Sequence, residues 1–287
     1  MKLEPLAGGL SNAAFIVADG AERYVARCGD DIPVHHVFRD RERAASVAAH
    51  AAGLSPEVVH CEPGVMVIRY IDGRTLAEAD LRSNIGRIAT LLGACHRDLA
   101  RHLEGPANTF WVFHVIRDYA RMLQAASGGN DRDLSRYVRL ADALEAGQIP
   151  LPIVFGHHDL LPGNLLDDGR RLWLIDWEYG GFGTAMFDLA NLAANGGFSP
   201  ADDLELLEAY FRATGARGAP ALVRRDESGE RVARGDLGHG LRDSPCGTGR
   251  RLSSARRGLP RAHRRSAGAL RREAWQSRRR GLTITAL

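Results

Sequence analysis

The sequence has no apolar run that approaches the ~18 to 20 residues of a membrane-spanning helix, and its first residues show neither the basic start nor the apolar stretch of an export signal. We therefore expect no membrane span and a cytoplasmic protein. The four cysteines lie far apart without a Cys-x-x-Cys pair, which argues against a zinc site and favours reduced thiols. With 45% hydrophobic and 25% charged residues among 287, the composition excludes collagen and wholesale disorder and suffices for a real core.

Lysine is nearly absent as well, because the chain has a single one, Lys2, and arginine carries almost all of the positive charge. The arginines are concentrated toward the C-terminus. Residues 221–287 hold 17 basic and 6 acidic residues, a formal charge of +11, whereas residues 1–220 hold 21 basic and 29 acidic residues, a charge of −8. A basic end of this kind is typical of a nucleic-acid-binding arm, so this segment needs its own explanation.

The first 73 residues combine short β-compatible runs with one helix. An Asp19-Gly20 turn signal separates two of the runs and predicts a hairpin. An alanine-rich stretch without internal glycine or proline ends at Gly53, where a helix commonly stops. The predicted elements are strands at 13–17, 24–27, 58–60 and 65–71 and a helix at 38–52. We interpret residues 1–73 as a β-rich, nucleotide-binding lobe.

From residue 81 onward the hydrophobic pattern becomes helical. Apolar side chains recur at steps of three and four residues, at positions 85, 88, 92, 95, 99 and 103. The predicted elements are helices at 81–103, 110–125, 133–146 and 204–213, with short strands at 153–155 and 172–175 around a polar loop. We expect residues 74–217 to form a helical catalytic lobe, which makes the fold class α+β with two lobes.

The strongest functional signal is a set of polar residues in and after this loop. His157, Asp159 and Asn164 form the pattern H-x-D-x-x-x-x-N, and Asp176 follows at the end of an apolar run. Phosphoryl transfer needs one carboxylate that orients the attacking hydroxyl, and an amide and a second carboxylate that hold the magnesium ions bridging the phosphates. The spacing therefore favours a kinase-type catalytic loop over ordinary loop chemistry. We expect His157 to orient the loop through hydrogen bonds and His158 to be a variable loop residue.

The same segment, and the stretch LIDWEYGGFGTAMFDLAN in particular, resembles the choline/ethanolamine kinase branch of the aminoglycoside phosphotransferase family. The resemblance covers residues 5–215 and implies a protein-kinase-like bilobal α+β fold with ATP and Mg²⁺ as cofactors. It implies that Asp159 is the catalytic base and that Asn164 and Asp176 are the Mg²⁺ ligands. Asp188 would be the acid that braces the catalytic loop.

A glycine-rich segment precedes the first predicted strand. Without Cβ atoms, its backbone N–H groups can approach nucleotide phosphates, although a plain glycine-rich turn has the same sequence. The residues concerned are Gly8, Gly9, Ser11 and Asn12. Residues 67–73 would form the hinge between the lobes and take the adenine edge, although a simple strand and turn would look the same.

Arg27 stands on the strand where protein kinases place a phosphate-binding lysine. Choline kinases resemble this chain here, since many of them also have arginine at this position, and a guanidinium group binds phosphate in a bidentate way. Glu42, midway along the following helix, would pair with Arg27 and hold it toward the nucleotide. The alternative is that both are ordinary surface charges.

Trp177, Glu178 and Tyr179 directly follow Asp176 and bring aromatic and acidic groups to the catalytic mouth. A quaternary ammonium group donates no hydrogen bonds, and a cation over an aromatic ring contributes ~0.5 to 2 kcal/mol. By the resemblance, Tyr179 matches an aromatic residue of the choline site, although a packed core tyrosine is the alternative. We expect the acceptor to be a small amino alcohol, choline or ethanolamine. An aminoglycoside or thiamine kinase and an impaired nucleotide-binding protein are the alternatives.

Residues 218–287 lack any sustained helical or strand period and are rich in arginine, glycine and serine, so they cannot bury a core. A basic arm for nucleic acid or anionic membrane is one interpretation, but no aromatic residues are interleaved, and we expect no specific nucleic-acid partner. Our hypothesis is an aberrant, disordered tail read in a shifted frame. Residues 235–244 can be back-translated into codons that spell ATWAMVSEI one nucleotide forward. Such a tail would lower solubility and activity, because choline kinases complete the acceptor pocket with aromatic residues of C-terminal helices.

Overall fold

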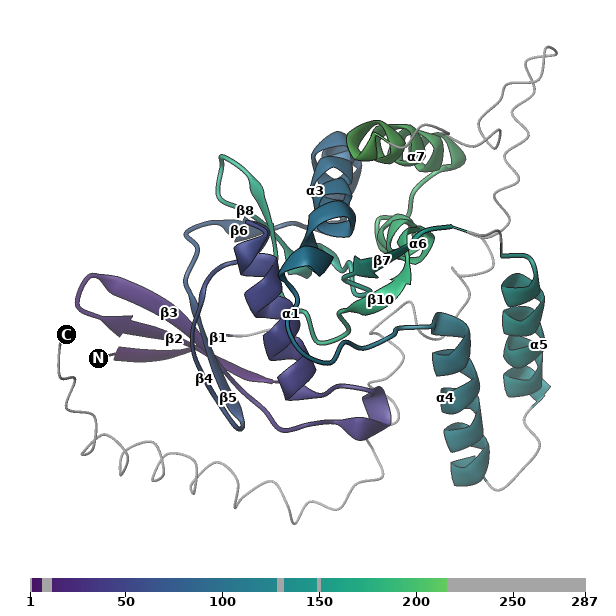
Figure 1. Cartoon of the computed structure of the whole chain (residues 1–287), viewed down its shortest axis with the longest axis horizontal. Helices are drawn as coiled ribbons and strands as arrows, with labels where there is room; N and C mark the ends of the chain where they lie inside the picture. The colour runs from purple at the N-terminus through teal and green to yellow at the C-terminus, as the bar shows by residue number, and fades with distance from the viewer. Residues whose placement is uncertain (1, 7–11, 128–131, 149–150, 216–287) are drawn as a thin grey trace. The chain divides into compact units, whose positions relative to one another are not determined.

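The computed structural model of the chain describes residues 2–6, 12–127, 132–148 and 151–215 (Figure 1). The predicted phosphate-binding residues Gly8, Gly9 and Ser11 and the predicted tail lie outside these ranges. Within them, no helix combines the length and the apolar character needed to cross a bilayer.

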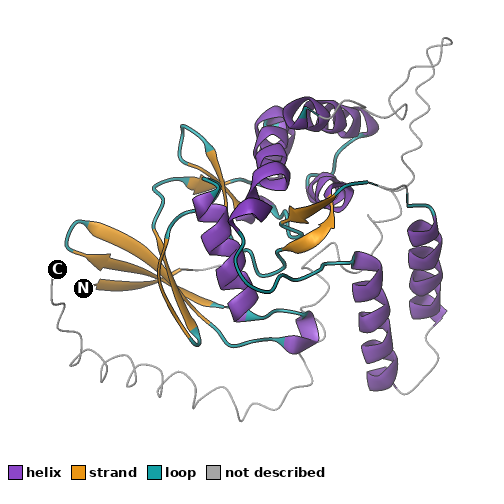
Figure 2. Ribbon diagram, viewed as in Figure 1, coloured by secondary structure: helices purple, strands orange, loops and turns teal. Residues whose placement is uncertain are grey.

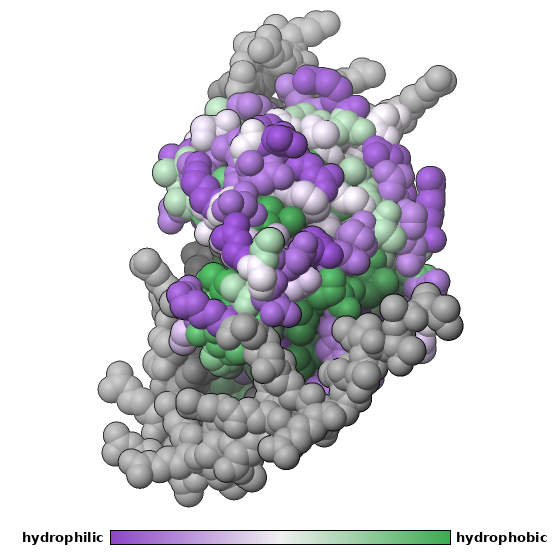
Figure 3. Space-filling view, turned by 90° about the vertical axis from the view of Figure 1, so that its left-hand side faces the viewer, coloured by the Kyte–Doolittle hydropathy of each residue, from purple (hydrophilic) through white to green (hydrophobic). Residues whose placement is uncertain are grey.

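A five-stranded antiparallel sheet occupies the N-terminal part, with the strand order β1-β2-β3-β5-β4. The strands are β1 (Lys2–Leu6), β2 (Ala13–Asp19), β3 (Glu22–Cys28), β4 (Val58–Glu62) and β5 (Val65–Arg69). The predicted strands are confirmed, except that β5 ends two residues early. The edge strand β1 was not predicted, because it is short, contains Pro5 and exposes all of its residues. Figure 3 views the molecule from the side of this sheet and shows hydrophobic surface among hydrophilic residues.

The helix α1 (Arg39–Ala51) confirms the predicted alanine-rich helix and packs against β4. Its inner face consists of small residues, with Ala45, Ala48 and Ala49 fully buried. Small side chains let the helix approach its neighbours closely, and the charged Glu42 is buried with them. Helix α1 therefore brings a carboxylate into the interior at a fixed place.

Helices dominate the described residues after Thr75 (Figure 2). They are α2 (Glu78–Ser83), α3 (Ile85–Asp98), α4 (Val112–Ser127), α5 (Arg132–Ala146), α6 (Ala185–Asn195) and α7 (Pro200–Thr214), with a 3₁₀ helix η2 (Leu99–His102) after α3. The predicted helix 81–103 is therefore divided. Asn84 leaves helical geometry at the division, and its side-chain amide donates to the carbonyl oxygen of Asp80 at 2.9 Å. A side chain that satisfies the backbone in this way competes with helix continuation.

Two small sheets hold the polar loop of the motif. One pairs β6 (Arg74–Thr75), β8 (Leu165–Asp167) and β9 (Leu172–Leu174), and the other pairs β7 (Ile153–Gly156) with β10 (Gly181–Thr184). Gly73 passes so close to β8 that a Cβ there would lie 2.5 Å from the carbonyl oxygen of Asp167. Neither β10 nor α6 was predicted as an element, because the sequence there was interpreted only as a functional motif.

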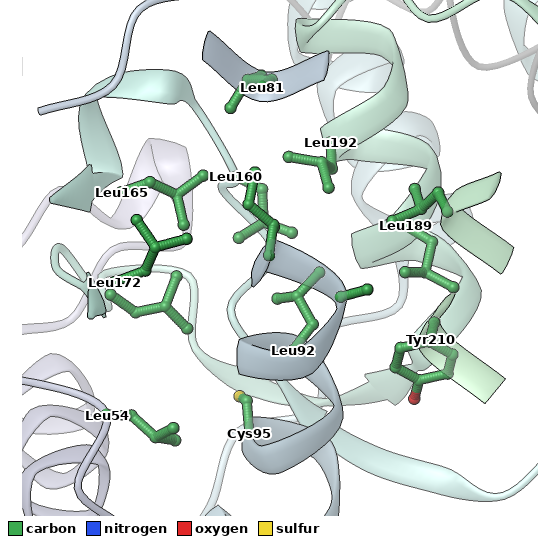
Figure 4. Close-up of a cluster of buried hydrophobic side chains, with 14 of the residues drawn as sticks. Leu54, Leu81, Leu92, Cys95, Leu160, Leu165, Leu172, Leu189, Leu192 and Tyr210 are labelled. Atoms are coloured by element: carbon green, nitrogen blue, oxygen red, sulfur yellow. The ribbon is translucent and has the colours of Figure 1, made fainter. Parts of the chain in front are cut away.

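The main core surrounds α3 and includes buried residues of the loop that carries Asp159 (Figure 4). Leu92 and Cys95 of α3 meet Leu189 of α6 and Leu160, the residue after Asp159. Leu160 is fully buried, and burial of such a side chain contributes about 1.5 to 3 kcal/mol. The loop that carries Asp159 is thus fixed to the core by its own sequence neighbour. A second, smaller cluster lies between α4 and α5 and includes Phe110.

Candidate active site

Asp159 and Asn164 lie in the loop between β7 and β8. The side-chain amide of Asn164 donates to the backbone oxygen of Asp159 at 2.8 Å and to its carboxylate at 3.1 Å. A 3₁₀ turn, η3 (Pro162–Asn164), closes the loop and makes this contact possible. The acid and the amide therefore face the same point, although five residues separate them.

Asp176 reaches this point because β8 pairs with β9. Leu165 lies opposite Leu174, and the amide of Ile175 donates to the backbone oxygen of Asn164 at 3.0 Å. Asp176 then has a φ of 70°, a left-handed conformation that is strained for a residue other than glycine. The pairing and the turn of the backbone bring the three side chains of the sequence motif together, as the spacing predicted.

Burial, together with repulsion from Asp176 and Glu178, raises the pKa of Asp159 to about 7, and the hydrogen bond from Asn164 offsets part of this rise. An aspartate that is not buried has a pKa of ~3.9. The loop is instead fixed to the core through Leu160, which removes water from the carboxylate. Asp159 is therefore a better proton acceptor than an exposed aspartate.

Two arginines and three carboxylates beside Asp159 form what we call the arginine cluster. Arg27, Arg39 and Glu42 come from β3 and α1, and Asp176 and Glu178 follow β9. Arg27 contacts Glu42 and Asp176, both at 2.5 Å, and its side chain is only 11% exposed. Burial lowers the pKa of Arg27, but Asp176 and Glu42 outweigh this effect, so the net pKa is raised and the guanidinium stays charged. The predicted Arg27–Glu42 pair is present in the interior and is not made of surface charges.

Asn12 lies beside this cluster. A cavity of about 200 Å³ is lined by Asn12, Arg27 and Glu42 together with the turn between β4 and β5. In the predicted hinge, the amide of Tyr70 already donates to the carbonyl oxygen of Arg23 at 3.1 Å. Adenine contact by residues 67–73 stays a prediction.

Asp188 braces the catalytic loop from below, in what we call the Asp188 cluster with His96, His157 and His158. Its carboxylate accepts hydrogen bonds from the backbone amides of His157 at 2.9 Å and His158 at 2.7 Å, and from Nε2 of His96 at 2.9 Å. Burial opposes its ionisation, but the three histidines outweigh burial and hold the pKa of Asp188 well below its usual range. The geometry fits the bracing role that the resemblance implied.

His157 connects the loop to the strand that precedes Asp176. Its Nε2 donates to the carbonyl oxygen of Ile175 at 2.9 Å, and its Nδ1 accepts from the amide of Asp159 at 3.3 Å. Burial lowers the pKa of His157, so the ring is neutral, as this pattern of one donor and one acceptor requires. These contacts fit the expected orienting role.

Trp177 lies away from the predicted substrate site. Its side chain is 1% exposed and belongs to the main core, and its indole N–H donates to the hydroxyl of Ser55 at 2.7 Å. That hydroxyl donates in turn to the backbone oxygen of Leu174 at 2.6 Å. We correct the assignment of Trp177 from substrate contact to support of β9, because a fully packed indole has no face left for a ligand.

Glu178 and Tyr179 remain near the site but are engaged. Arg39 lies 3.3 Å from Glu178 and 2.6 Å from Glu42. It therefore links Glu178, which is close in sequence to Asp176, to helix α1. Tyr179 is half-buried against the α4–α5 cluster, and its ring is nearly perpendicular to that of Phe110, with an interplanar angle of 79°. Packing and ligand contact are therefore compatible for Tyr179.

Several residues of the site were missed by the sequence reasoning. His96 lies on the apolar stripe of α3, four residues after Leu92, and a polar residue on such a stripe is a usable signal. Asn191 accepts from the amide of Leu160 at 2.6 Å and so fixes the loop to α6. Arg39 had no distinguishing signal, since it is one of several arginines at the start of α1.

Comparisons with known proteins show the family and the fold of the chain. Residues 2–227 match the phosphotransferase enzyme family. The chain belongs to this family. A choline/ethanolamine kinase family protein of Mesorhizobium loti is 33% identical, with a TM-score of 0.60 over 74% of this chain and 70% of that protein. This likeness confirms the protein-kinase-like α+β fold.

Two proteins named LicA are also similar. LicA of Haemophilus influenzae is 28% identical over 215 residues, which are 72% of this chain and 62% of that protein. The choline kinase LicA from Streptococcus pneumoniae is 22% identical, with a TM-score of 0.62 over 73% of this chain and 74% of that protein, and shows the same fold. The chain thus spans less than two thirds of the length of the Haemophilus protein.

Proposed function

We propose that the chain is an ATP-dependent kinase that transfers the γ-phosphate to the hydroxyl group of choline or ethanolamine. The observation that carries this proposal is the convergence of Asp159, Asn164 and Asp176 opposite the buried Arg27–Glu42 pair. Family membership supports phosphoryl transfer, and the names of the similar proteins support an amino alcohol as the acceptor.

Mg²⁺ fits the oxygen donors of this site. It prefers oxygen ligands and is usually held by one or two carboxylates together with the phosphates that it bridges. Asp176 offers a carboxylate, and Asn164 offers its amide oxygen because its amide nitrogen donates to Asp159. When bound, the ion would neutralise charge on the β- and γ-phosphates. Arg27, which stays charged, would add a second positive group toward the same phosphates.

Asp159 would orient the acceptor hydroxyl and receive its proton. Its pKa of about 7 matches the neutral pH at which a general base acts most effectively. Asn164 holds the carboxylate in place through its amide. Phosphoryl transfer depends mainly on such positioning, since the protein supplies little covalent chemistry.

The acceptor would lie between Asp159 and Tyr179. The ring of Tyr179 offers a π face to an ammonium group, and the acidic side chains of Asp176 and Glu178 favour a positive charge nearby. Glu178 is only 9% exposed and contacts Arg39, so its charge is partly neutralised. We therefore assign the main cation contact to Tyr179 and a weaker, electrostatic contribution to Glu178.

The test is a product assay with the full chain, Mg²⁺, ATP and a panel of hydroxylated amines. The panel contains choline, ethanolamine, thiamine and an aminoglycoside, and mass spectrometry identifies the phosphorylated product. We expect turnover with choline or ethanolamine. Asp159→Asn should lower kcat by ~10² to 10⁴ while ATP affinity is retained, since the amide cannot accept the proton.

Each other outcome rejects a defined part of the proposal. Phosphorylation of thiamine or the aminoglycoside alone would replace the acceptor and leave the kinase chemistry. ATP binding without a product from any acceptor would identify an impaired nucleotide-binding protein. Unchanged turnover of the Asp159→Asn variant would remove Asp159 from its role.

A further inference from the structure

His158 is buried beside Asp159 but has no part in the chemistry described above. Its side chain is 4% exposed, and its φ of 65° lies in the left-handed region that residues other than glycine rarely adopt. The expectation that His158 is a variable loop residue stays a prediction, but the structure shows a buried ring where an exposed one is usual for a loop. A side chain that is buried on a strained backbone is kept there by specific contacts.

The ring of His158 connects the catalytic loop to the segment after Asp176. Its Nδ1 lies 3.1 Å from the backbone oxygen of Tyr179. Because a carbonyl oxygen only accepts, Nδ1 carries the proton and donates it to this bond. Nε2 is buried and has no hydrogen-bond partner within the described ranges, so the ring makes one polar contact there, the one to Tyr179.

Neighbouring elements shape the space around this ring. Phe110 stacks on it with a centroid distance of 4.5 Å and an interplanar angle of 15°, and Phe187 of α6 lies at 5.7 Å. A Cβ on Gly156 would lie 2.6 Å from Nε2, and one on Gly183 would lie 2.9 Å from it. Strands β7 and β10, which pair with each other, thus carry glycine where the ring packs against them, and the orientation of the ring is fixed.

We propose that His158 is a positioning residue of the acceptor site, whose Nδ1–H holds the backbone of Tyr179 at a fixed distance from Asp159. The inference rests on the proposed kinase function. The ring adjoins Asp159 in sequence and reaches Tyr179, the main cation contact, across 21 residues. The buried Nε2 without a hydrogen-bond partner and the left-handed backbone of His158 both cost free energy. The hydrogen bond to Tyr179 offsets this cost, and a loop residue without a side-chain donor at this place would not make it.

Two substitutions separate the hydrogen bond from the stacking. His158→Phe keeps a flat ring against Phe110 but removes the Nδ1 donor. His158→Asn places an amide N–H at the position of Nδ1 and tolerates the left-handed backbone, but it removes the ring. His102 is exposed in η2, so His102→Phe and His102→Asn are matched controls.

The kinetic constants of the full chain should differ between the two variants. For His158→Phe we expect kcat to fall about tenfold and the acceptor KM to rise, with the ATP KM unchanged within about twofold, because one hydrogen bond that orients the acceptor side is lost. For His158→Asn we expect kcat within about threefold of the unsubstituted chain. The two His102 variants should behave like the unsubstituted chain.

Ring-nitrogen NMR of the ¹⁵N-histidine-labelled chain tests the bond without any turnover. At neutral pH we expect a proton on Nδ1 of His158 and none on Nε2, with the resonance assigned by its loss in His158→Asn. Hydrogen exchange of the amides in residues 176–180 should be faster in His158→Phe than in His158→Asn.

The two measurements also separate the two proposals. If the unsubstituted chain phosphorylates no acceptor, the proposed function fails, and the nitrogen spectrum and the exchange rates still decide the role of His158. A proton on Nε2 of His158, or equal kinetics and equal exchange for the Phe variant and the unsubstituted chain, would overturn the positioning role. An Asn variant that is folded by circular dichroism but as impaired as the Phe variant would do the same.

Discussion

Two buried polar clusters flank Asp159, and they are held in place by different kinds of group. The arginine cluster on the nucleotide side joins α1, β3 and the segment after β9 through the ends of long side chains. The Asp188 cluster on the other side joins α3, α6 and the catalytic loop through two backbone amides and short side chains in the core. Side-chain ends can exchange partners when a ligand binds, whereas backbone amides have no alternative acceptor once they are buried.

This difference predicts separate consequences for stability and for ligand binding. The arginine cluster contains two arginines that share one carboxylate, so the loss of one arginine leaves Glu42 paired. In the Asp188 cluster, one carboxylate serves three donors, so its loss leaves all three without an acceptor. We therefore expect substitutions in the Asp188 cluster to affect folding and substitutions in the arginine cluster to affect nucleotide binding.

The largest expected effect is that of Asp188→Ala. Removing one partner of a buried, hydrogen-bonded charge network costs about 3 to 5 kcal/mol, a large share of the stability of an ordinary domain. Denaturant unfolding of the full chain, followed by circular dichroism, should show this loss. The stability of Asp188→Asn should lie between that of the unsubstituted chain and that of Asp188→Ala, because the amide oxygen of asparagine still accepts hydrogen bonds. Asp72→Ala is the control, since Asp72 is an exposed acid. Equal stability of the Asp188→Ala and Asp72→Ala variants would contradict the bracing role.

Much of the fold could be predicted because local patterns agree with it. The turn at Gly20, the alanine-rich α1 and the apolar stripe of α3 each indicate their element without knowledge of distant contacts. The failures occur where distant contacts decide. Strand β1 is formed by pairing with β2, and α2 is separated from α3 by the side chain of Asn84. Such outcomes depend on neighbours that a local pattern does not contain.

The site shows the same division between spacing and surroundings. Asp159, Asn164 and Asp176 could be predicted as a group because their spacing reflects one loop and one strand pair. Sequence adjacency to Asp176 suggested a ligand role for Trp177, but the direction of a side chain depends on the turn of the backbone at Asp176. The raised pKa of Asp159 could not be predicted from the sequence, since it depends on burial by residues far along the chain.

The second prediction tests the nucleotide side with Arg27→Met. The variant keeps much of the apolar stem and removes the charge, so we expect ATP affinity to fall about 10- to 100-fold, the range for a charge-assisted hydrogen bond. Stability should change less than in Asp188→Ala, because Glu42 keeps Arg39. Titration calorimetry with ATP and Mg²⁺ measures the affinity, and Arg23→Met on the same strand is the matched control. An ATP affinity equal to that of the control would remove Arg27 from phosphate binding.

A smaller effect is expected for Tyr210→Phe, which changes the Asp188 cluster from a distance. The hydroxyl of Tyr210 in α7 lies 2.8 Å from Nδ1 of His96, while Nε2 of the same ring donates to Asp188. In a neutral ring Nδ1 then accepts from the hydroxyl, and loss of this hydroxyl should cost about 1 to 3 kcal/mol in unfolding free energy. Tyr24→Phe on the N-terminal sheet serves as the control. A Tyr210→Phe variant as stable as this control would show that the hydroxyl does not support His96.

The smallest expected effect is on the pH dependence of stability, and it distinguishes the two clusters directly. Burial lowers the pKa of His157 and of His158 from 6.5, although Asp188 faces both rings and opposes this shift. As the pH falls below 6.5, the unfolded chain binds protons at these two histidines that the folded chain does not, so their contribution to stability is largest above that pH and decreases toward pH 5. Asp159, whose pKa is raised to about 7, contributes with the opposite sign in this range.

One such group contributes at most about 1.4 kcal/mol per pH unit. His158→Asn should therefore reduce the histidine contribution to the slope of unfolding free energy between pH 7 and 5. Arg27 itself does not titrate in this range because its pKa is raised, so a change of slope in Arg27→Met would report on the carboxylates that Arg27 contacts. If the slope between pH 7 and 5 were the same in the unsubstituted chain and in His158→Asn, the ring of His158 would not be neutral and buried in solution.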